Sequence, residues 1–326
     1  MRYKLKALMN TASPNLISVV VPCYNSGPWL NELADQVHEV MTANSWDYEL
    51  ILVNDASEPE TWSVIKELAE SRSQIRGLDL MFNTGQYRAT LCGLEQAVGH
   101  IIVTMDDDLQ HPPSQLPVII NTLLEDETTD CVFGSFDRKR HGLIRNIGTA
   151  FMSWMFRVAY KKPKHVRQTT FRAMRRSLID TILEFSTVNP NINPLIFQSS
   201  SRVVSVTVEH AARAAGKSGY GLGALTRMML DNILSVSTLP LKAMSFIGFL
   251  SAFGSFCLGV FYLVQYLNDV IKTPGFSTQV LLICFFGGMT LMSIGLLGEY
   301  VIRIMDEVRG RPRYVIRSAT DSREDS

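Results

Sequence analysis

Two long uncharged stretches near the C-terminus constrain this chain more than any other feature of its sequence. Residues 243–268 and 273–298 contain no Asp, Glu, Lys or Arg, and the only charged residues between them are Asp269 and Lys272. Each stretch exceeds the roughly 20 residues that a helix needs to cross about 30 Å of hydrocarbon. The sequence therefore predicts a transmembrane hairpin with helices at about 243–268 and 276–300. The alternative is a buried helical hairpin in a soluble protein.

Basic residues around the hairpin predict its orientation. The loop between the two stretches carries a single Lys272, whereas five arginines lie between residues 299 and 317, directly after the second stretch. Because positive charge accumulates on the cytoplasmic side of membrane proteins, we expect both chain ends to lie in the cytoplasm and the protein to be integral to the cytoplasmic membrane. The five arginines are Arg303, Arg309, Arg311, Arg313 and Arg317.

The balanced charge and the cysteine pattern exclude some classes of function. The 31 basic and 31 acidic residues cancel, so no overall field favours nucleic acid as a partner. The five cysteines are widely spaced and form neither a CxxC metal motif nor a disulfide framework, which indicates a reducing compartment. Residues 1–15 lack an apolar run of signal-peptide length, so we expect no cleaved leader.

The N-terminal part of the chain alternates short apolar runs with helix-like stretches, which is typical of a mostly parallel α/β sheet covered by helices. Polar residues follow three of these runs directly. In open parallel sheets, ligands bind outside the carboxyl ends of the strands, so a binding site is expected there. The strand candidates are 17–22, 48–54, 75–81, 100–105 and 131–134, and the polar segments are 23–25, 55–57 and 106–108.

Three successive acids, Asp106, Asp107 and Asp108, follow the fourth predicted strand. They repel one another unless a cation lies among them, and Mg²⁺ or Mn²⁺ is typically held by one or two carboxylates together with a substrate's phosphates. Alternate residues of an extended segment point the same way, so Asp106 and Asp108 can converge on one ion while Asp107 points elsewhere. The alternative is a solvated turn, or a cap on the following helix.

The middle region, about 136–240, is less regular. Two stretches, 143–158 and 225–236, have apolar residues at helical spacing, and they either lie on the bilayer surface or pack against the sheet. A basic run at Arg138, Lys139, Arg140 and Arg145 is either an anion site or an ordinary solvated face.

Five segments together resemble a known family: VVVPCYNS at 19–26, VNDAS at 53–57, NTGQYRATLCGL at 83–94, DDDLQHPP at 106–113 and GLLGEYVIRIMDEVRGRPRYVI at 295–316. In this order, and with a C-terminal apolar hairpin, they resemble family 2 glycosyltransferases of the polyprenyl-phosphate type. The resemblance implies a GT-A (Rossmann-like) catalytic domain at 16–221, after an N-terminal extension at 1–15. A juxtamembrane amphipathic helix at 222–240, the hairpin at 241–304 and a cytoplasmic basic tail at 305–326 would follow.

The implied activity is metal-dependent, inverting transfer of a sugar from a nucleotide-sugar to polyprenyl phosphate, with undecaprenyl phosphate the expected carrier. Asp55 would contact the base. The family usually has two acids there, whereas Asn54 precedes Asp55 here, which leaves the base preference of this contact open. The expected donor is a UDP-sugar, with a GDP-sugar as the alternative. The implied metal site is Asp106, Asp108 and Gln110, with Mg²⁺ or Mn²⁺. The implied nucleotide-binding residues are Pro22, Tyr24, Asn25, Asp55, Asn83, Gly85, Gln86 and Asp107.

For the acceptor, the resemblance implies arginines that clamp the lipid phosphate through forked hydrogen bonds. It also implies a mobile loop at 210–220, whose Arg213 would act in catalysis, whereas His210 is interpreted as an ordinary strand-end histidine. Several relatives carry an acid where this chain has Thr170, so no protein base is assigned; an ionised phosphate can attack the sugar unaided. The implied acceptor residues are Arg138, Arg140, Arg145, Lys217, Ser218 and Tyr220.

Two other functions compete with this one. The first is a membrane glycosyltransferase with a different lipid or a polysaccharide as acceptor, although the Q-x-x-R-W motif of processive synthases is absent from the sequence. The second is an inactive family member that acts as a membrane scaffold, which the intact acids at 106 and 108 disfavour because unused carboxylates would repel without compensation. A homo-oligomer is compatible with all three functions.

Overall fold

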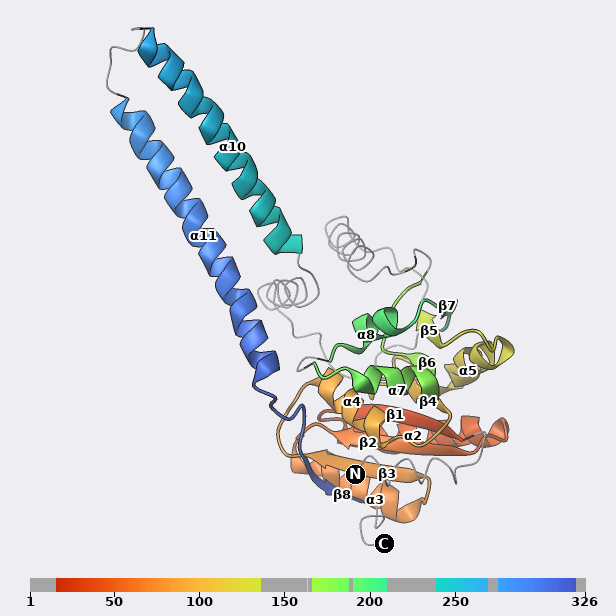
Figure 1. Ribbon diagram of the computed structural model, residues 1–326. Coiled ribbons are helices and arrows are strands. Elements are labelled where there is room, and N and C mark those ends of the chain that lie inside the picture. The colour runs from red at the N-terminus through yellow and green to blue at the C-terminus, as the bar shows by residue number, and fades with distance from the viewer. Residues whose placement is uncertain are drawn as a thin grey trace. The chain divides into compact units, whose positions relative to one another are not determined.

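The structure, a computed structural model, describes residues 16–135, 163, 166–187, 190–209, 239–268 and 275–320. The chain divides into two compact units (Figure 1). The first comprises Met1–Ser218 together with Arg311–Ser326, and the second comprises Gly219–Gly310. The chain therefore leaves the first unit, forms the second, and returns to the first at its C-terminal end.

The first unit is built on an eight-stranded sheet with the order β7-β5-β6-β4-β1-β2-β3-β8. Strands β4, β1, β2 and β3 are parallel neighbours, whereas β6 is antiparallel to β4 and β5, and β8 is antiparallel to β3. The five predicted strands are present, and β6, β7 and β8 are additions to them. The strands are β1 Ile17–Cys23, β2 Tyr48–Asn54, β3 Ile75–Leu80, β4 Ile101–Thr104, β5 Cys131–Ser135, β6 Arg172–Arg175, β7 Val203–Thr207 and β8 Ile316–Ala319.

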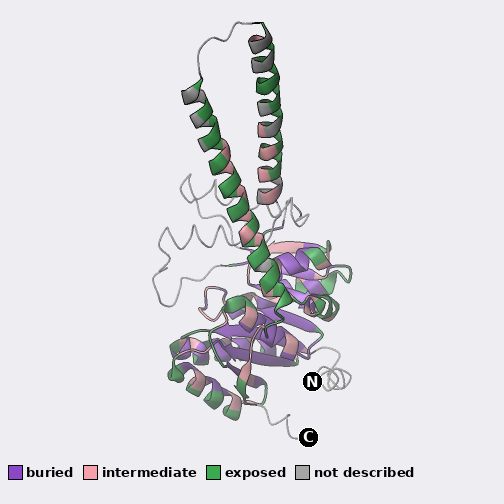
Figure 2. Ribbon diagram, turned by 60° about the vertical axis from the view of Figure 1, so that its left-hand side comes forward, coloured by how far each residue is buried: buried purple, intermediate pink, exposed green. Residues whose placement is uncertain are grey.

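Helices cover both faces of this sheet, and Figure 2 shows the buried strands in purple. Every residue of β1 and β2 is buried, as expected for parallel strands covered on both sides. One apolar cluster packs α2, α3 and α5 on one face, and a second packs α4, α7 and α8 on the other. The helices are α2 Gly27–Ala43, α3 Pro59–Ser71, α4 Gln86–Gln96, α5 Leu116–Glu125, α7 Arg176–Glu184 and α8 Ile192–Ser199, with a short 3-10 helix η1 at Pro113–Gln115.

Helix α4 lies unusually close to the sheet because of one glycine. A Cβ atom on Gly93 would lie 2.3 Å from Cγ1 of Val20, so any larger residue there would force either the Val20 side chain or the helix to move. The helix begins after Gly85, whose φ of 84° is readily adopted only by glycine. These two glycines fix the height of α4 over the sheet and therefore the place of its first residue, Gln86.

The second unit contains two long helices, α10 Leu239–Leu267 and α11 Phe276–Val308. Each contains a window apolar and long enough to cross a membrane, Met244–Phe261 and Phe285–Val308, and none of the residues described in these windows is buried. Large apolar side chains such as Phe249 (68% exposed) and Leu291 (72% exposed) face outward. This exposure disfavours the buried hairpin of a soluble protein. Helix α11 also continues past the predicted end at 300.

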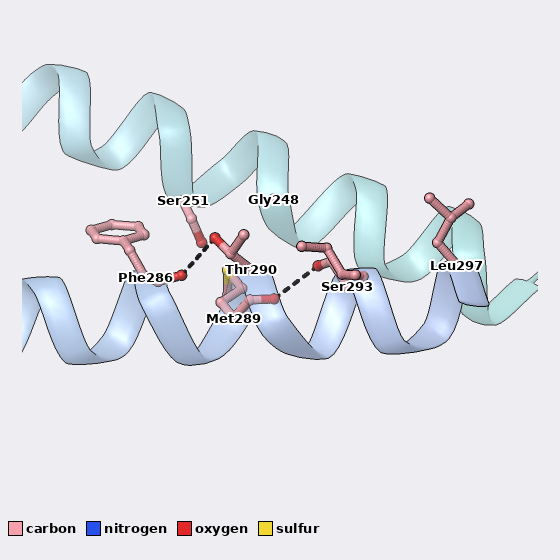
Figure 3. A pocket seen from close by; sticks show the side chains of 8 residues that line it. Gly248, Ser251, Phe286, Met289, Thr290, Ser293 and Leu297 are labelled. Atoms are coloured by element: carbon pink, nitrogen blue, oxygen red, sulfur yellow. Dashed lines mark hydrogen bonds between the residues drawn. The ribbon is translucent and has the colours of Figure 1, made fainter. Parts of the chain in front are cut away.

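The two helices form a shallow groove between them (Figure 3), lined by Gly248, Ser251, Phe286, Met289, Thr290, Ser293, Ile294 and Leu297. The hydroxyl of Thr290 donates to the carbonyl of Phe286 at 2.8 Å, and that of Ser293 donates to the carbonyl of Met289 at 2.9 Å. Both hydroxyl protons are thus satisfied within α11, which suits a hydrocarbon environment.

Candidate functional site

Sharp turns follow three strands at the carboxyl edge of the parallel sheet. Among the described residues, four non-glycine residues have a positive φ, and three of them lie in the segments that follow strands at this edge. They are Asn25 after β1 (55°), Ala56 after β2 (49°) and Leu109 after β4 (58°). Such backbone conformations are uncommon outside glycine and concentrate at functional sites. The polar segments predicted from the sequence therefore lie in tight, specifically built turns.

The turn after β1 is bonded to both neighbouring turns. The backbone N–H of Asn25 donates to Oγ of Ser57 at 3.0 Å, and the Asn25 side-chain oxygen accepts from the N–H of Glu58 at 3.0 Å. The N–H of Tyr24 donates to Oδ2 of Asp107 at 3.1 Å. Tyr24 itself is exposed, so its ring lies open to a ligand at this edge.

Asp55 holds the loop that precedes α4. Its buried carboxylate accepts three hydrogen bonds, from the N–H and the hydroxyl of Thr84 at 2.7 and 2.8 Å and from the N–H of Gly85 at 2.8 Å. Both carboxylate oxygens are used. This anchoring role was not predicted, and it brings Asn83 and Gln86 to the same edge as the turns after β1 and β2.

The first two acids of the triplet have different partners. Asp106 accepts from Nε2 of Gln86 at 2.5 Å and from the hydroxyl of Thr170 at 2.6 Å. Asp107 instead accepts from the backbone N–H of Tyr24, in the turn after β1.

The third acid, Asp108, accepts from the N–H of Gln110 at 3.1 Å, which closes a tight local turn. Leu109, the residue between them, is the one with positive φ. The predicted metal residues Asp106, Asp108 and Gln110 are therefore neighbours on one turn.

The electrostatics of this turn favour a cation. The pKa of Asp107 is raised to about 6, chiefly by burial and also by the adjacent carboxylates of Asp106 and Asp108, which together outweigh the lowering effect of hydrogen bonds from Tyr24 and Ser26. In the described part of the chain, no three His, Cys, Asp or Glu side chains form a complete metal site. The oxygen donors present fit Mg²⁺ or Mn²⁺ in the usual arrangement, in which substrate phosphates and waters complete the coordination.

Arg172, a buried arginine that the sequence did not predict as a site residue, supports this site through hydrogen bonds. Arg172 donates from Nε to Oγ1 of Thr104 at 3.0 Å and also bonds the side chain of Asn193. Its burial lowers its pKa to about 10. Thr104 in turn donates to the carbonyl of Thr170 at 2.7 Å. This network fixes the segment from which the Thr170 hydroxyl reaches Asp106.

A small recess opens beside Asp106. Its walls come from β1, α4, β4 and the start of β6, and its lining is Pro22, Gln86, Tyr87, Thr90, Thr104, Met105, Asp106, Thr170 and Arg172. The predicted residues Pro22 and Gln86 thus lie together with Asp106. The Phe171-Arg172 segment was visible in the sequence, but only the pairing of β6 with β4 shows that it lies against the site.

The remaining predicted residues lie outside the described part of the chain. These are the acceptor and loop residues Arg138, Arg140, Arg145, Arg213, Lys217, Ser218 and Tyr220, together with the amphipathic stretches at 143–158 and 225–236.

Comparison with known proteins decides the family. Residues 18–183, just over half of the chain, match the model for glycosyl transferase family 2. The chain belongs to this family. It is therefore a glycosyltransferase, and the family resemblance seen in the sequence is confirmed.

Relatives match over nearly the whole chain. An undecaprenyl-phosphate 4-deoxy-4-formamido-L-arabinose transferase from Aeromonas hydrophila is 32% identical, covering 96% of this chain and 97% of its own length. The transferase of the same name from Proteus mirabilis is 30% identical and covers 93% of both chains.

A solved structure shows the same fold. Glucosyl-3-phosphoglycerate synthase from Mycobacterium tuberculosis, in complex with Mn²⁺, uridine diphosphate and phosphoglyceric acid, matches with a TM-score of 0.50 and 20% identity. The match covers 72% of this glycosyltransferase and 82% of that chain. The mostly parallel α/β sheet is of the GT-A type, as predicted.

Proposed function

We propose that this glycosyltransferase moves a sugar from a nucleotide-sugar to undecaprenyl phosphate at the cytoplasmic face of a membrane. The observation that carries the proposal is the extent of the match. Relatives named as undecaprenyl-phosphate sugar transferases align over more than nine-tenths of both chains, a span that includes the apolar hairpin. A shared catalytic domain alone would leave the acceptor open.

The donor would bind along the carboxyl edge of the parallel strands. Tyr24, Asn25 and the loop held by Asp55 would contact the nucleoside, with a UDP-sugar favoured and a GDP-sugar second. Asp106, Asp108 and Gln110 would hold Mg²⁺ or Mn²⁺ against the diphosphate. Bound there, the ion neutralises the charge that develops on the leaving nucleoside diphosphate.

The acceptor phosphate needs no protein base. Its second pKa is about 6, so near neutral pH its oxygen is largely ionised and can attack the anomeric carbon directly. As the new carbon–oxygen bond forms, the bond to the diphosphate breaks on the opposite face, and the configuration inverts. Thr170, at the position where the family resemblance implies an acid, carries a hydroxyl that donates to Asp106 and so cannot itself act as the base.

The hairpin would anchor the enzyme in the bilayer. Helices α10 and α11 would cross it, and the arginines after residue 300 would keep both chain ends on the cytoplasmic side.

Sealed vesicles test the function and its sidedness together. Membrane vesicles that contain the protein and undecaprenyl phosphate should convert an added radiolabelled nucleotide-sugar into a product that partitions into organic solvent. Charged donors do not cross bilayers, so only inside-out vesicles should be active. Label that appears in protein or polysaccharide, or equal activity in right-side-out vesicles, would contradict the proposal.

The basic run after β5 yields a prediction about the acceptor. If Arg140 and Arg145 clamp the lipid phosphate, changing either to Ala should raise the KM for undecaprenyl phosphate about tenfold to hundredfold, since each charge-assisted bond contributes roughly 1.5–3 kcal/mol. The KM for the nucleotide-sugar should change little. Lysine should restore only part of the loss, because an ammonium cannot form two parallel hydrogen bonds.

Of the three implied arginines, Arg138 is the one that we expect to be solvated, so Arg138→Ala removes the same charge from the start of the run and serves as the matched control. Unchanged lipid KM values in all three variants, with turnover abolished by Arg213→Ala alone, would move the phosphate to the loop at 210–220.

A further inference from the structure

The chain that returns from α11 becomes part of the catalytic sheet. Strand β8, dark blue in Figure 1, pairs antiparallel with β3 and covers its free edge. At one end of this pairing, the N–H of Met81 donates to the carbonyl of Val315 at 2.8 Å. At the other, the N–H groups of Gly77 and Thr320 bond to Thr320 Oγ1 and the Gly77 carbonyl. Met81 begins the loop that Asp55 anchors, so β8 reaches one end of the candidate donor site.

Side chains before β8 fix this return. The hydroxyl of Tyr314 donates to the carboxylate of Glu95 on α4, and Arg313 donates to the carbonyl of Phe185 after α7. Tyr314 and Ile316 also pack against the apolar cluster on the α4 face of the sheet. The segment after residue 311 is therefore bonded to three elements of the catalytic domain.

Arg317 connects β8 to the donor edge by two routes. Directly, its guanidinium donates to the carbonyl of Met81 at 2.8 Å. Indirectly, it lies 3.5 Å from Oδ2 of Asp79, a carboxylate that is only 3% exposed. Arg317 is itself about half exposed, so its ion pair with Asp79 adds little stability. Its effect would come from fixing the positions of Met81 and Asp79.

The second route continues to the turn after β2. Asp79 pairs in register with Asn54, and its Oδ1 accepts from Nδ2 of Asn54 at 2.7 Å. An ionised carboxylate only accepts, so it orients the amide with its oxygen turned away. That oxygen accepts from the N–H of Ser57 at 3.3 Å, and the hydroxyl of Ser57 accepts from Asn25. Four side chains thus link the C-terminal strand to the turns after β2 and β1.

We propose that Arg317 is a positioning residue for the donor nucleotide. It holds the start of the 81–85 loop through Met81 and keeps Asp79, and through it Asn54 and Ser57, in the orientation that the turns require. The inference rests on the proposed function, which places the donor at this edge. It also gives a role to Asn54, whose amide is oriented by the carboxylate of Asp79 on the adjacent strand.

The test uses full-length protein in detergent, with UDP and GDP in the presence of Mg²⁺ as probes. Arg317→Ala should weaken binding of the preferred nucleotide about tenfold, and should raise the donor KM similarly, because the loop and turn lose a shared support. The KM for undecaprenyl phosphate should stay within about twofold, which separates positioning of the donor from general damage to the fold. Arg317→Lys should recover part of the loss. Arg202→Ala, an exposed arginine just before β7, is the control and should change neither constant.

A double variant tests the route through Asp79. In an Asp79→Asn background the buried group is neutral and no longer needs a cation, so adding Arg317→Ala should cost less than it does in the wild type. Wild-type affinity in Arg317→Ala, equal rises in both KM values, or full additivity of the two changes would each overturn the inference. Wild-type protein that binds neither nucleotide would overturn the proposed function and this inference with it.

Discussion

Replacing Asp108 by Asn should lower the turnover rate of sugar transfer by about two to three orders of magnitude, the usual effect of removing one group that stabilises developing charge. The substitution removes an anionic oxygen from the predicted metal site. It keeps an oxygen that can accept from the N–H of Gln110, so the local turn should survive. Turnover of a radiolabelled nucleotide-sugar measures the effect, and the melting temperature should stay close to that of the wild type.

Removing the metal ion should also abolish turnover, as expected if Asp108 acts through that ion. A chelator should abolish activity, and either Mg²⁺ or Mn²⁺ should restore it in the wild type but not in Asp108→Asn. Asp126→Asn is the matched control: it removes the charge of an exposed aspartate whose carboxylate accepts from Thr128 and Thr129, outside the candidate site. Full activity in chelator, or near-normal turnover in Asp108→Asn, would reject the metal assignment.

Asp108 is a better residue than Asp106 for testing the metal site, because the two carboxylates have different hydrogen-bond partners. Asp106 bonds Gln86 from α4 and Thr170 from the segment before β6. Its replacement would disturb two distant parts of the chain as well as the metal site, so a loss of activity would have several causes. The bond from Asp108 to Gln110 is local.

The parallel core of the fold was predictable because burial on both faces leaves a direct mark on sequence. In β1 and β2 every residue is buried, so the runs from Ile17 and Tyr48 are almost continuously apolar. Strand β6, Arg172–Arg175, has no such apolar pattern, because it begins and ends with an arginine. Arg172 is nevertheless buried, and its guanidinium donates hydrogen bonds to the side chains of Thr104 and Asn193. Strand β8 pairs with β3 across the entire hairpin, a separation over which no local pattern indicates a partner.

The site divides in the same way. Polar residues at the ends of parallel strands were predictable, because the topology alone brings Asn25, Asp55 and Asp106 to one edge. The hydrogen-bond partner of each side chain was not predictable, because tertiary packing alone brings Thr170 to Asp106 and Arg317 to Asp79. For Asp55 this difference changes the expected chemistry. The family resemblance assigns it to the nucleobase, whereas the structure shows its carboxylate holding a loop.

The anchoring role makes Asp55→Asn the other substitution with a large expected effect. An amide replaces one acceptor oxygen by a donor, so either the N–H of Gly85 or the paired donors of Thr84 would face an N–H₂ group. Each lost bond to a charged acceptor is worth roughly 1.5–3 kcal/mol, so donor affinity should fall about tenfold to hundredfold if one bond is lost and further if two are lost. Because Gln86 follows this loop and bonds Asp106, turnover should fall too.

Two comparisons separate anchoring from base recognition. Thr84→Val removes only the hydroxyl donor and keeps both backbone bonds to Asp55, so it should weaken donor binding about tenfold, the lower end of the range for one bond to a charged acceptor, and less than Asp55→Asn does. Measured with UDP and GDP, Asp55→Asn should reduce the affinity for whichever nucleotide the wild type binds, with no gain for the other, since a displaced loop serves neither. A residue that only reads the base would instead change the preference between the two nucleotides and leave turnover at saturating donor intact. Wild-type affinity in Asp55→Asn would contradict both roles, because the three hydrogen bonds that hold the loop would then contribute nothing to the donor site.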